Sequence, residues 1–75
     1  MIKIRYCVVW NYYPRAASLA ENIKKELGTD VKLESGDRGE FSVWYKKQLV
    51  CQKTIDGYPP PEDVVVLLKE ILEKY

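Results

Sequence analysis

The sequence predicts an α/β fold: a two-layer α+β sandwich in which two helices cover one face of a four-stranded mixed sheet. Four short segments alternate apolar with polar residues, and two longer segments repeat apolar residues every three or four positions. The order along the chain is strand, helix, three strands and helix. With 75 residues there is room for one hydrophobic core. We therefore expect a single domain over residues 1–75.

The first segment, residues 1–9, has the period of two that is typical of a strand. The segment alternates between an apolar set, Ile2, Ile4, Tyr6 and Val8, and a second set, Lys3, Arg5 and Cys7. A helix is expected next, from about residue 11–14 to Leu27. Pro14 suits its first turn, and Gly28 suits the position just after its end. The apolar stripe of this helix consists of Ala16, Leu19, Ala20, Ile23 and Leu27.

The second half of the chain predicts three strands and a closing helix. Residues 31–35 and 41–45 alternate as short strands, with a glycine-containing loop between them. Residues 49–54 alternate again after a short hairpin turn at residues 46–48, and this pattern places Leu49 and Cys51 on the helix side. The closing helix begins at Pro61 or Glu62. Its expected buried stripe is Val64, Leu67, Leu68, Ile71, Leu72 and Tyr75.

Composition excludes several classes of function. Twelve basic and eleven acidic residues leave a net charge of +1, which gives no electrostatic footprint for nucleic acid or an anionic membrane. Histidine is absent, so there is no Ser-His-Asp triad, Cys-His dyad or imidazole metal site. The loop at residues 36–39 lacks the spacing of a phosphate-binding loop. We expect no cofactor and no metal.

The two cysteines define the remaining chemistry. They lie 44 positions apart, which excludes a C-x-x-C motif, a zinc quartet and a disulfide framework. No apolar run approaches the roughly 20 residues that span a bilayer, and no signal peptide opens the chain. We therefore expect a soluble cytoplasmic domain, a monomer or weak homodimer, whose chemistry depends on one thiol or the other.

Several motifs together resemble the selenoprotein W-like family (Rdx; SelT/SelW/SelH). They are Ile4-Arg5-Tyr6-Cys7-x-x-Trp10-x-Tyr12, Arg15-Ala16-Ala17-x-Leu19-Ala20, Gly39-x-Phe41-x-Val43, Leu49-Val50-x-Gln52-Lys53 and Asp56-Gly57-Tyr58-Pro59. The resemblance implies a thioredoxin-like βαβββα fold and a thiol redox activity. In that family, C-x-x-C or C-x-x-selenocysteine follows the first strand. Cys7 occupies the first redox position, but Trp10 occupies the second, so a dithiol cycle is not available at this site.

Cys7 is the candidate catalytic residue. It is expected at the carboxyl end of a parallel strand and just before a helix, where open α/β sheets place their chemistry. The positive end of the helix dipole favours a thiolate there. The alternative is that Cys7 is a buried cysteine acting as a small hydrophobe.

Cys51 has two interpretations. It is either a core cysteine or a distant resolving partner of Cys7. In a thioredoxin-like strand order the first and fourth strands are two spacings apart, about 9–10 Å. This exceeds the roughly 7 Å limit between the Cα atoms of a disulfide, so geometry argues against the pair.

Trp10, Tyr12 and Trp44 are the candidate binding residues. Trp10 is a lid over Cys7, an anchor of its loop, or a substituted selenocysteine, whose codon differs from that of tryptophan by one base. Trp44 is out of phase with the core positions of its strand and points to the open face of the sheet. Its expected neighbours there are Lys3, Arg5, Lys32, Glu34 and Val50. Their stems cover it, or it belongs to a partner surface.

Two functions follow from these residues. The first is a thiol redox protein that works through Cys7 alone, forming a mixed disulfide or a sulfenic acid that an external thiol resolves. The second is a non-catalytic protein-binding module on a redox scaffold. Its contact would lie at Trp44 or around Trp10 and Tyr12. The expected partner is an unidentified protein or a glutathione-type thiol, with no nucleic acid and no membrane.

The resemblance also predicts the strand layout. It places the third strand beside the first, so that residues 1–6 pair with residues 41–46. The loop at residues 35–39 then crosses the end of the first strand. Cys7, Trp10, residues 36–39 and residues 55–59 would form one rim at that end of the sheet. The alternative pairs the second and third strands directly as a hairpin, the default for neighbours in sequence.

Overall fold

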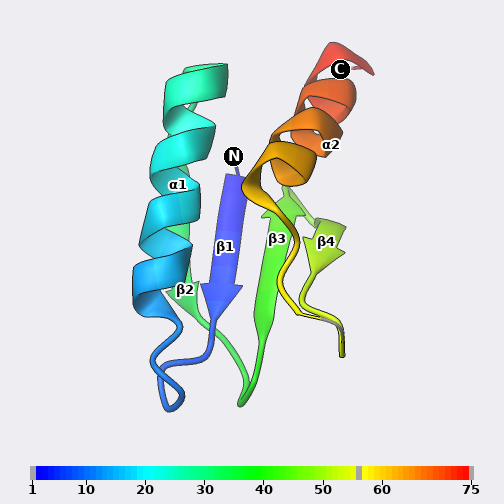
Figure 1. Cartoon of the computed structure of the whole chain (residues 1–75). Coiled ribbons are helices and arrows are strands. Elements are labelled where there is room, and N and C mark those ends of the chain that lie inside the picture. The colour runs from blue at the N-terminus through cyan, green and yellow to red at the C-terminus, as the bar shows by residue number, and fades with distance from the viewer. Residues whose placement is uncertain (1, 56, 75) are drawn as a thin grey trace.

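The computed structural model describes residues 2–55 and 57–74 of the chain (Figure 1). Its elements are β1 (Ile2–Tyr6), α1 (Tyr13–Leu27), β2 (Val31–Ser35), β3 (Phe41–Tyr45), β4 (Gln48–Gln52) and α2 (Pro61–Lys74). The predicted βαβββα order with a four-stranded mixed sheet is confirmed. Predictions that involve Met1, Asp56 and Tyr75 lie outside the described residues.

The strands lie side by side in the order β2-β1-β3-β4. β1 is parallel to β2 and antiparallel to β3, with Ile2 opposite Tyr45 and Tyr6 opposite Phe41. The crossing layout is therefore confirmed, and the hairpin of the second and third strands is wrong. The loop after β2 begins where the backbone N–H of Gly36 donates to the carbonyl of Tyr6, at 2.8 Å.

Both helices cover the same face of the sheet, and the core fills the space between the two layers (Figure 1). The buried core residues come from both layers and are Ile2, Ile4, Ala16, Leu19, Ile23, Phe41, Val43, Val64 and Leu68. The predicted stripe of α1 is confirmed, since Ala20 and Leu27 also pack against this cluster. Gly28 ends the helix in the left-handed conformation, with φ 67°, and its N–H donates to the carbonyl of Lys24.

The first strand is shorter than predicted, because the chain turns directly after Tyr6. The N–H of Asn11 donates to the carbonyl of Val8, and that of Tyr12 to the carbonyl of Cys7, each at 3.0 Å. This turn ends the alternation. Cys7 is 1% exposed and Val8 is 58% exposed, so the prediction that Val8 continues the buried phase is wrong.

A bulge changes the predicted phase of β4. Val43 lies opposite Cys51 and Trp44 lies opposite Leu49, which leaves Val50 as an extra residue. Cys51 packs against the core as predicted, and Val50 packs there too. Leu49 instead shares the phase of Trp44 and is exposed, so its predicted place on the helix side is wrong.

Helix α2 presents a slightly different stripe from the predicted one. Val64 and Leu68 are fully buried, and Val65 packs against the core cluster. Leu67 lies at the edge of the buried face and is exposed, so its predicted burial is wrong. Neither helix, within the described residues, combines the length and the apolar character needed to cross a membrane.

Candidate functional site

The thiol of Cys7 lies at the start of a loop, residues 7–12, that connects β1 to α1. Its sulfur accepts a hydrogen bond from the backbone N–H of Trp10, with 3.3 Å between nitrogen and Sγ. The carbonyl of Cys7 accepts a hydrogen bond from the backbone N–H of Tyr12, and this bond closes the loop. Cys7 therefore has the predicted place between a strand end and a helix start, and it is almost fully buried there.

The indole of Trp10 lies against Gly39, in the loop between β2 and β3. A Cβ atom added to Gly39 would come within 3.0 Å of the indole, so only glycine allows this approach without displacing Trp10. Gly39 also has φ 76°, which favours glycine. Trp10 is 54% exposed, and its ring meets that of Tyr12 edge-on at 6.0 Å. This geometry supports the interpretation of Trp10 as a loop anchor.

Three aromatic rings connect the Cys7 loop to the segment after β4. The ring of Tyr58 lies 5.2 Å from that of Tyr12 and 5.1 Å from that of Phe41, both edge-to-face. These contacts bring the described part of residues 55–59 to the same end of the sheet as Trp10 and Gly39. The predicted rim is therefore present in the described residues.

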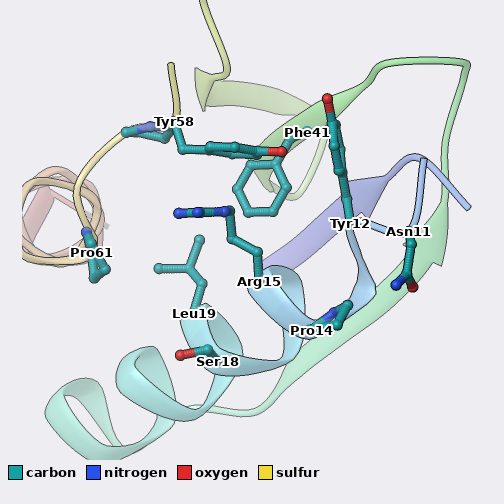
Figure 2. A pocket seen from close by; sticks show the side chains of 10 residues that line it. Asn11, Tyr12, Pro14, Arg15, Ser18, Leu19, Phe41, Tyr58 and Pro61 are labelled. Carbon is teal, nitrogen blue, oxygen red and sulfur yellow. The ribbon is translucent and has the colours of Figure 1, made fainter.

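A cavity of about 450 Å³ opens beside these rings (Figure 2). Its lining comes from the Cys7 loop, the first turns of both helices, the start of β3 and the segment before α2, and consists of Asn11, Tyr12, Pro14, Arg15, Ser18, Leu19, Phe41, Tyr58, Pro59 and Pro61. The sequence predictions singled out Tyr12 alone among these residues. Five of the others stood in motifs of the resemblance, but none of them was predicted to line a site: Arg15, Leu19, Phe41, Tyr58 and Pro59.

Arg15 and Tyr58 form the polar part of the cavity. Figure 2 shows the guanidinium of Arg15 stacked on the ring of Tyr58, with 3.9 Å between its central carbon and the ring centroid. Desolvation, with a smaller contribution from the side-chain hydrogen bond and the charge of Tyr12, raises the pKa of Tyr58 to about 12, although the charge and the hydrogen bond of Arg15 oppose the shift. The phenol of Tyr58 is therefore neutral at physiological pH and can serve as a hydrogen-bond donor.

Cys51 lies on β4, away from the Cys7 loop. Desolvation raises the pKa of its thiol to about 11. β3 separates β4 from β1, and both cysteines are free thiols. These observations favour the core interpretation of Cys51 over that of a resolving partner.

Trp44 lies on the open face of the sheet, as predicted, and takes no part in lining the cavity. Its indole Nε1–H donates to Ser42 Oγ at 2.9 Å, and that hydroxyl donates to Glu40 Oε2 at 2.6 Å. Lys3 is its cross-strand neighbour, whereas Val50 is absent from this face because of the bulge in β4. The half-buried indole is thus held by a polar network, which favours the interpretation that polar neighbours cover it.

Within residues 2–55 and 57–74, no group of three or more carboxylate or thiol side chains is placed to hold a metal ion. The candidate site consists of the Cys7 loop and the aromatic cavity that two residues of this loop, Asn11 and Tyr12, help to line.

Comparison with known proteins identifies a family model that matches the chain and solved structures with the same fold. The model of the Rdx family matches residues 1–72. A crystal structure of a protein from Bordetella parapertussis superposes with a TM-score of 0.85 at 24% identity, covering 93% of this chain and 94% of the other. A selenoprotein W-related protein from Vibrio cholerae superposes with a TM-score of 0.84 at 19% identity, covering 93% and 92%. No curated protein matches the chain.

Proposed function

The chain belongs to the Rdx family, whose members are generally thiol redox proteins, and on that premise we propose that it acts through the single thiol of Cys7. The observation that carries the proposal is the position of this sulfur: it lies between β1 and α1, with the N–H of Trp10 directed at it. An N–H donor and a helix start both stabilise negative charge on a sulfur.

The proposed step is a thiol–disulfide exchange. The Cys7 thiolate attacks one sulfur of a substrate disulfide, the substrate S–S bond breaks, and the second substrate sulfur leaves as a thiolate that takes a proton from water. A mixed disulfide between Cys7 and the substrate remains. Because position 10 is tryptophan, an external thiolate must attack this mixed disulfide and release Cys7 again.

A peroxide would react at the same sulfur. The thiolate attacks one peroxide oxygen, the O–O bond breaks, and an alcohol or water leaves, so that Cys7 becomes a sulfenic acid. One external thiol then condenses with the sulfenic acid and releases water, and a second external thiol frees Cys7. Both routes need a glutathione-type thiol or a protein thiol, which is why we place the protein in the reducing cytoplasm.

The direct test is turnover of bis(2-hydroxyethyl) disulfide with excess glutathione, followed by the NADPH consumption of glutathione reductase. We expect turnover by the wild-type protein, none above background for Cys7→Ser, and unchanged turnover for Cys51→Ser. Equal turnover by Cys7→Ser and the wild type would overturn the proposal, as would a wild-type rate no higher than that of glutathione alone.

The second candidate function is a non-catalytic protein-binding module. It is favoured by the large apolar side chains on the Cys7 loop and the start of α1, since Val8, Val9, Trp10 and Tyr13 are each at least half exposed. Such a patch is typical of a contact surface. Absence of wild-type turnover in the assay above would favour this function over the redox one.

A further inference from the structure

The cavity beside the Cys7 loop has mostly aromatic and aliphatic walls. Tyr12, Phe41 and Tyr58 supply three rings, and Leu19 and the prolines supply the aliphatic part. Its volume of about 450 Å³ lies in the range of small-ligand and side-chain pockets. An occupant therefore gains most of its contact area from an apolar group.

Arg15 is the one charged residue among those that line this cavity. Arg15 stacks on Tyr58 through a face of its guanidinium and also hydrogen-bonds the Tyr58 side chain, and the remaining N–H groups lie at the edge of the guanidinium. The ion pairs of the described residues involve other side chains, on the open sheet face and at the end of α1. Within this part of the chain, Arg15 has no carboxylate partner.

The start of α1 adds to the positive charge of Arg15. Helix α1 has no acidic residue in its first turn, and the side chain of Tyr12 does not cap it. The start of a helix carries partial positive charge, so α1 favours an anion at the same place as Arg15. Helix α2 also begins at the cavity, with Pro61, but Glu62 and Asp63 in its first turn offset the partial positive charge there.

We propose that this cavity binds a peptide segment of the partner protein in which a carboxylate side chain follows an aromatic or aliphatic side chain. The carboxylate pairs with the remaining N–H groups of the Arg15 guanidinium, and the apolar side chain packs among the rings of Tyr12, Phe41 and Tyr58. A free anion would use only the first of these features. Glutathione carries carboxylates without an apolar side chain, so it fits the walls poorly.

The position of the cavity connects peptide binding to the thiol. Asn11 and Tyr12 line the cavity and belong to the loop that begins at Cys7. A bound segment would thus lie beside the loop that carries the thiol. The identification of the partner as a thiol or disulfide protein rests on the proposed function, whereas the peptide site itself does not.

The test uses binding alone and needs no redox step. The reduced wild-type protein is titrated with acetyl-Gly-Phe-Glu-Gly-amide, and amide chemical shifts are followed by NMR. The matched probes are the Phe-Gln and Ala-Glu peptides of the same length, and S-methylglutathione. The protein variants are Arg15→Gln and, as a control with the same change of charge, Lys47→Gln in the hairpin turn far from the cavity.

We expect the Phe-Glu peptide to bind about tenfold more tightly than the Phe-Gln peptide, a difference of about 1.4 kcal/mol. The shifts should centre on Asn11, Tyr12 and Tyr58. Arg15→Gln should remove the preference, and Lys47→Gln should keep it. Equal binding of the two peptides would overturn the proposal, as would a preference that survives Arg15→Gln. Binding of S-methylglutathione or the Ala-Glu peptide as tightly as the Phe-Glu peptide would also overturn it.

This binding result is independent of the turnover assay. If Cys7 proved inert while the Phe-Glu preference held, the peptide site would stand and the redox function would fail. If the protein turned over the disulfide but showed no preference for the Phe-Glu peptide, the redox function would stand and the peptide site would fail.

Discussion

The backbone N–H of Trp10 points at the sulfur of Cys7, 3.3 Å away, while the indole of the same residue lies against Gly39. The backbone of the Cys7 loop thus places position 10 next to the sulfur, as a two-thiol motif would require. The loop thus has the spacing of a C-x-x-C motif with one thiol, and the proposed chemistry depends on that sulfur.

Replacing Trp10 by cysteine should restore a two-thiol site. The Cα atom of position 10 is bonded to the backbone nitrogen that contacts Cys7 Sγ, so a thiol there starts close to that sulfur, and we expect Trp10→Cys to form an intramolecular disulfide on mild oxidation. Intact-protein mass spectrometry would show the loss of two hydrogen atoms, and alkylation would label only Cys51. Trp10→Ala is the control and should gain no such bond. Three free thiols in oxidised Trp10→Cys would contradict this expectation.

Gly39 and Gly28 form a matched pair for testing the contact between the two loops. Both have positive φ, but an added Cβ meets the Trp10 indole only at Gly39, and nothing within 4 Å at Gly28. We expect Gly28→Ala to cost about 1 kcal/mol in the free energy of unfolding, from backbone strain alone. Gly39→Ala should cost about 2 kcal/mol and also shift the fluorescence of Trp10. Equal costs with unchanged fluorescence would show that the indole does not rest on Gly39.

Glu40 predicts a pH dependence of stability. Burial acts to raise the pKa of its carboxyl, but the hydrogen bonds from Ser42 and from the Asp37 N–H, with the charge of Arg5, bring the pKa below its usual range. A carboxyl whose pKa is lower in the folded state stabilises the fold above its unfolded pKa. This contribution is lost as the pH falls through the folded pKa.

The matching variant is Glu40→Gln, which should lower the free energy of unfolding by about 1 kcal/mol at neutral pH. The difference from the wild type should shrink in acid, as urea unfolding at a series of pH values would measure. Glu21→Gln on the exposed side of α1 has the same change of charge and should show no such trend. A difference between Glu40→Gln and the wild type that is independent of pH would be inconsistent with the network.

Most of the fold could be predicted from the sequence, because the periodicity of residues 13–27, 31–35 and 41–45 is strong and proline or glycine residues stand near the ends of these segments. The order of the strands in the sheet could not be predicted from periodicity. The loop at residues 36–40 is compatible with either a hairpin or a crossing, so only the family resemblance favoured the observed pairing of β1 with β3.

Two of the errors arose where hydrogen bonding overrode an alternating pattern. Val8 continues the apolar phase of β1, but its carbonyl accepts the N–H of Asn11 in a turn. Leu49 and Cys51 are two residues apart, but the bulge at Val50 puts them on opposite faces. A period of two cannot reveal either event, since the residue types remain compatible with a continuous strand.

The cavity could not be predicted either. Arg15 has the signature of an exposed helix residue, and Tyr58 lies in a proline-rich connector. Their contact depends on the crossing layout and on where α2 begins. By contrast, the position of Cys7 at the end of a strand and before a helix followed from local patterns alone.

The alkylation rates of the two cysteines test the central claim most directly. At about pH 8, the pKa of about 11 leaves only about one Cys51 thiol in a thousand as thiolate, so its reaction should be slow. We expect the short Cys7 loop to open locally at a lower free-energy cost than global unfolding, which would expose the buried sulfur to the reagent. With iodoacetamide and peptide mapping of the reduced native protein, we expect Cys7 to be labelled much faster than Cys51, and Cys7→Ser to lose the fast phase. Equally slow labelling of both cysteines would contradict a reactive thiol at Cys7.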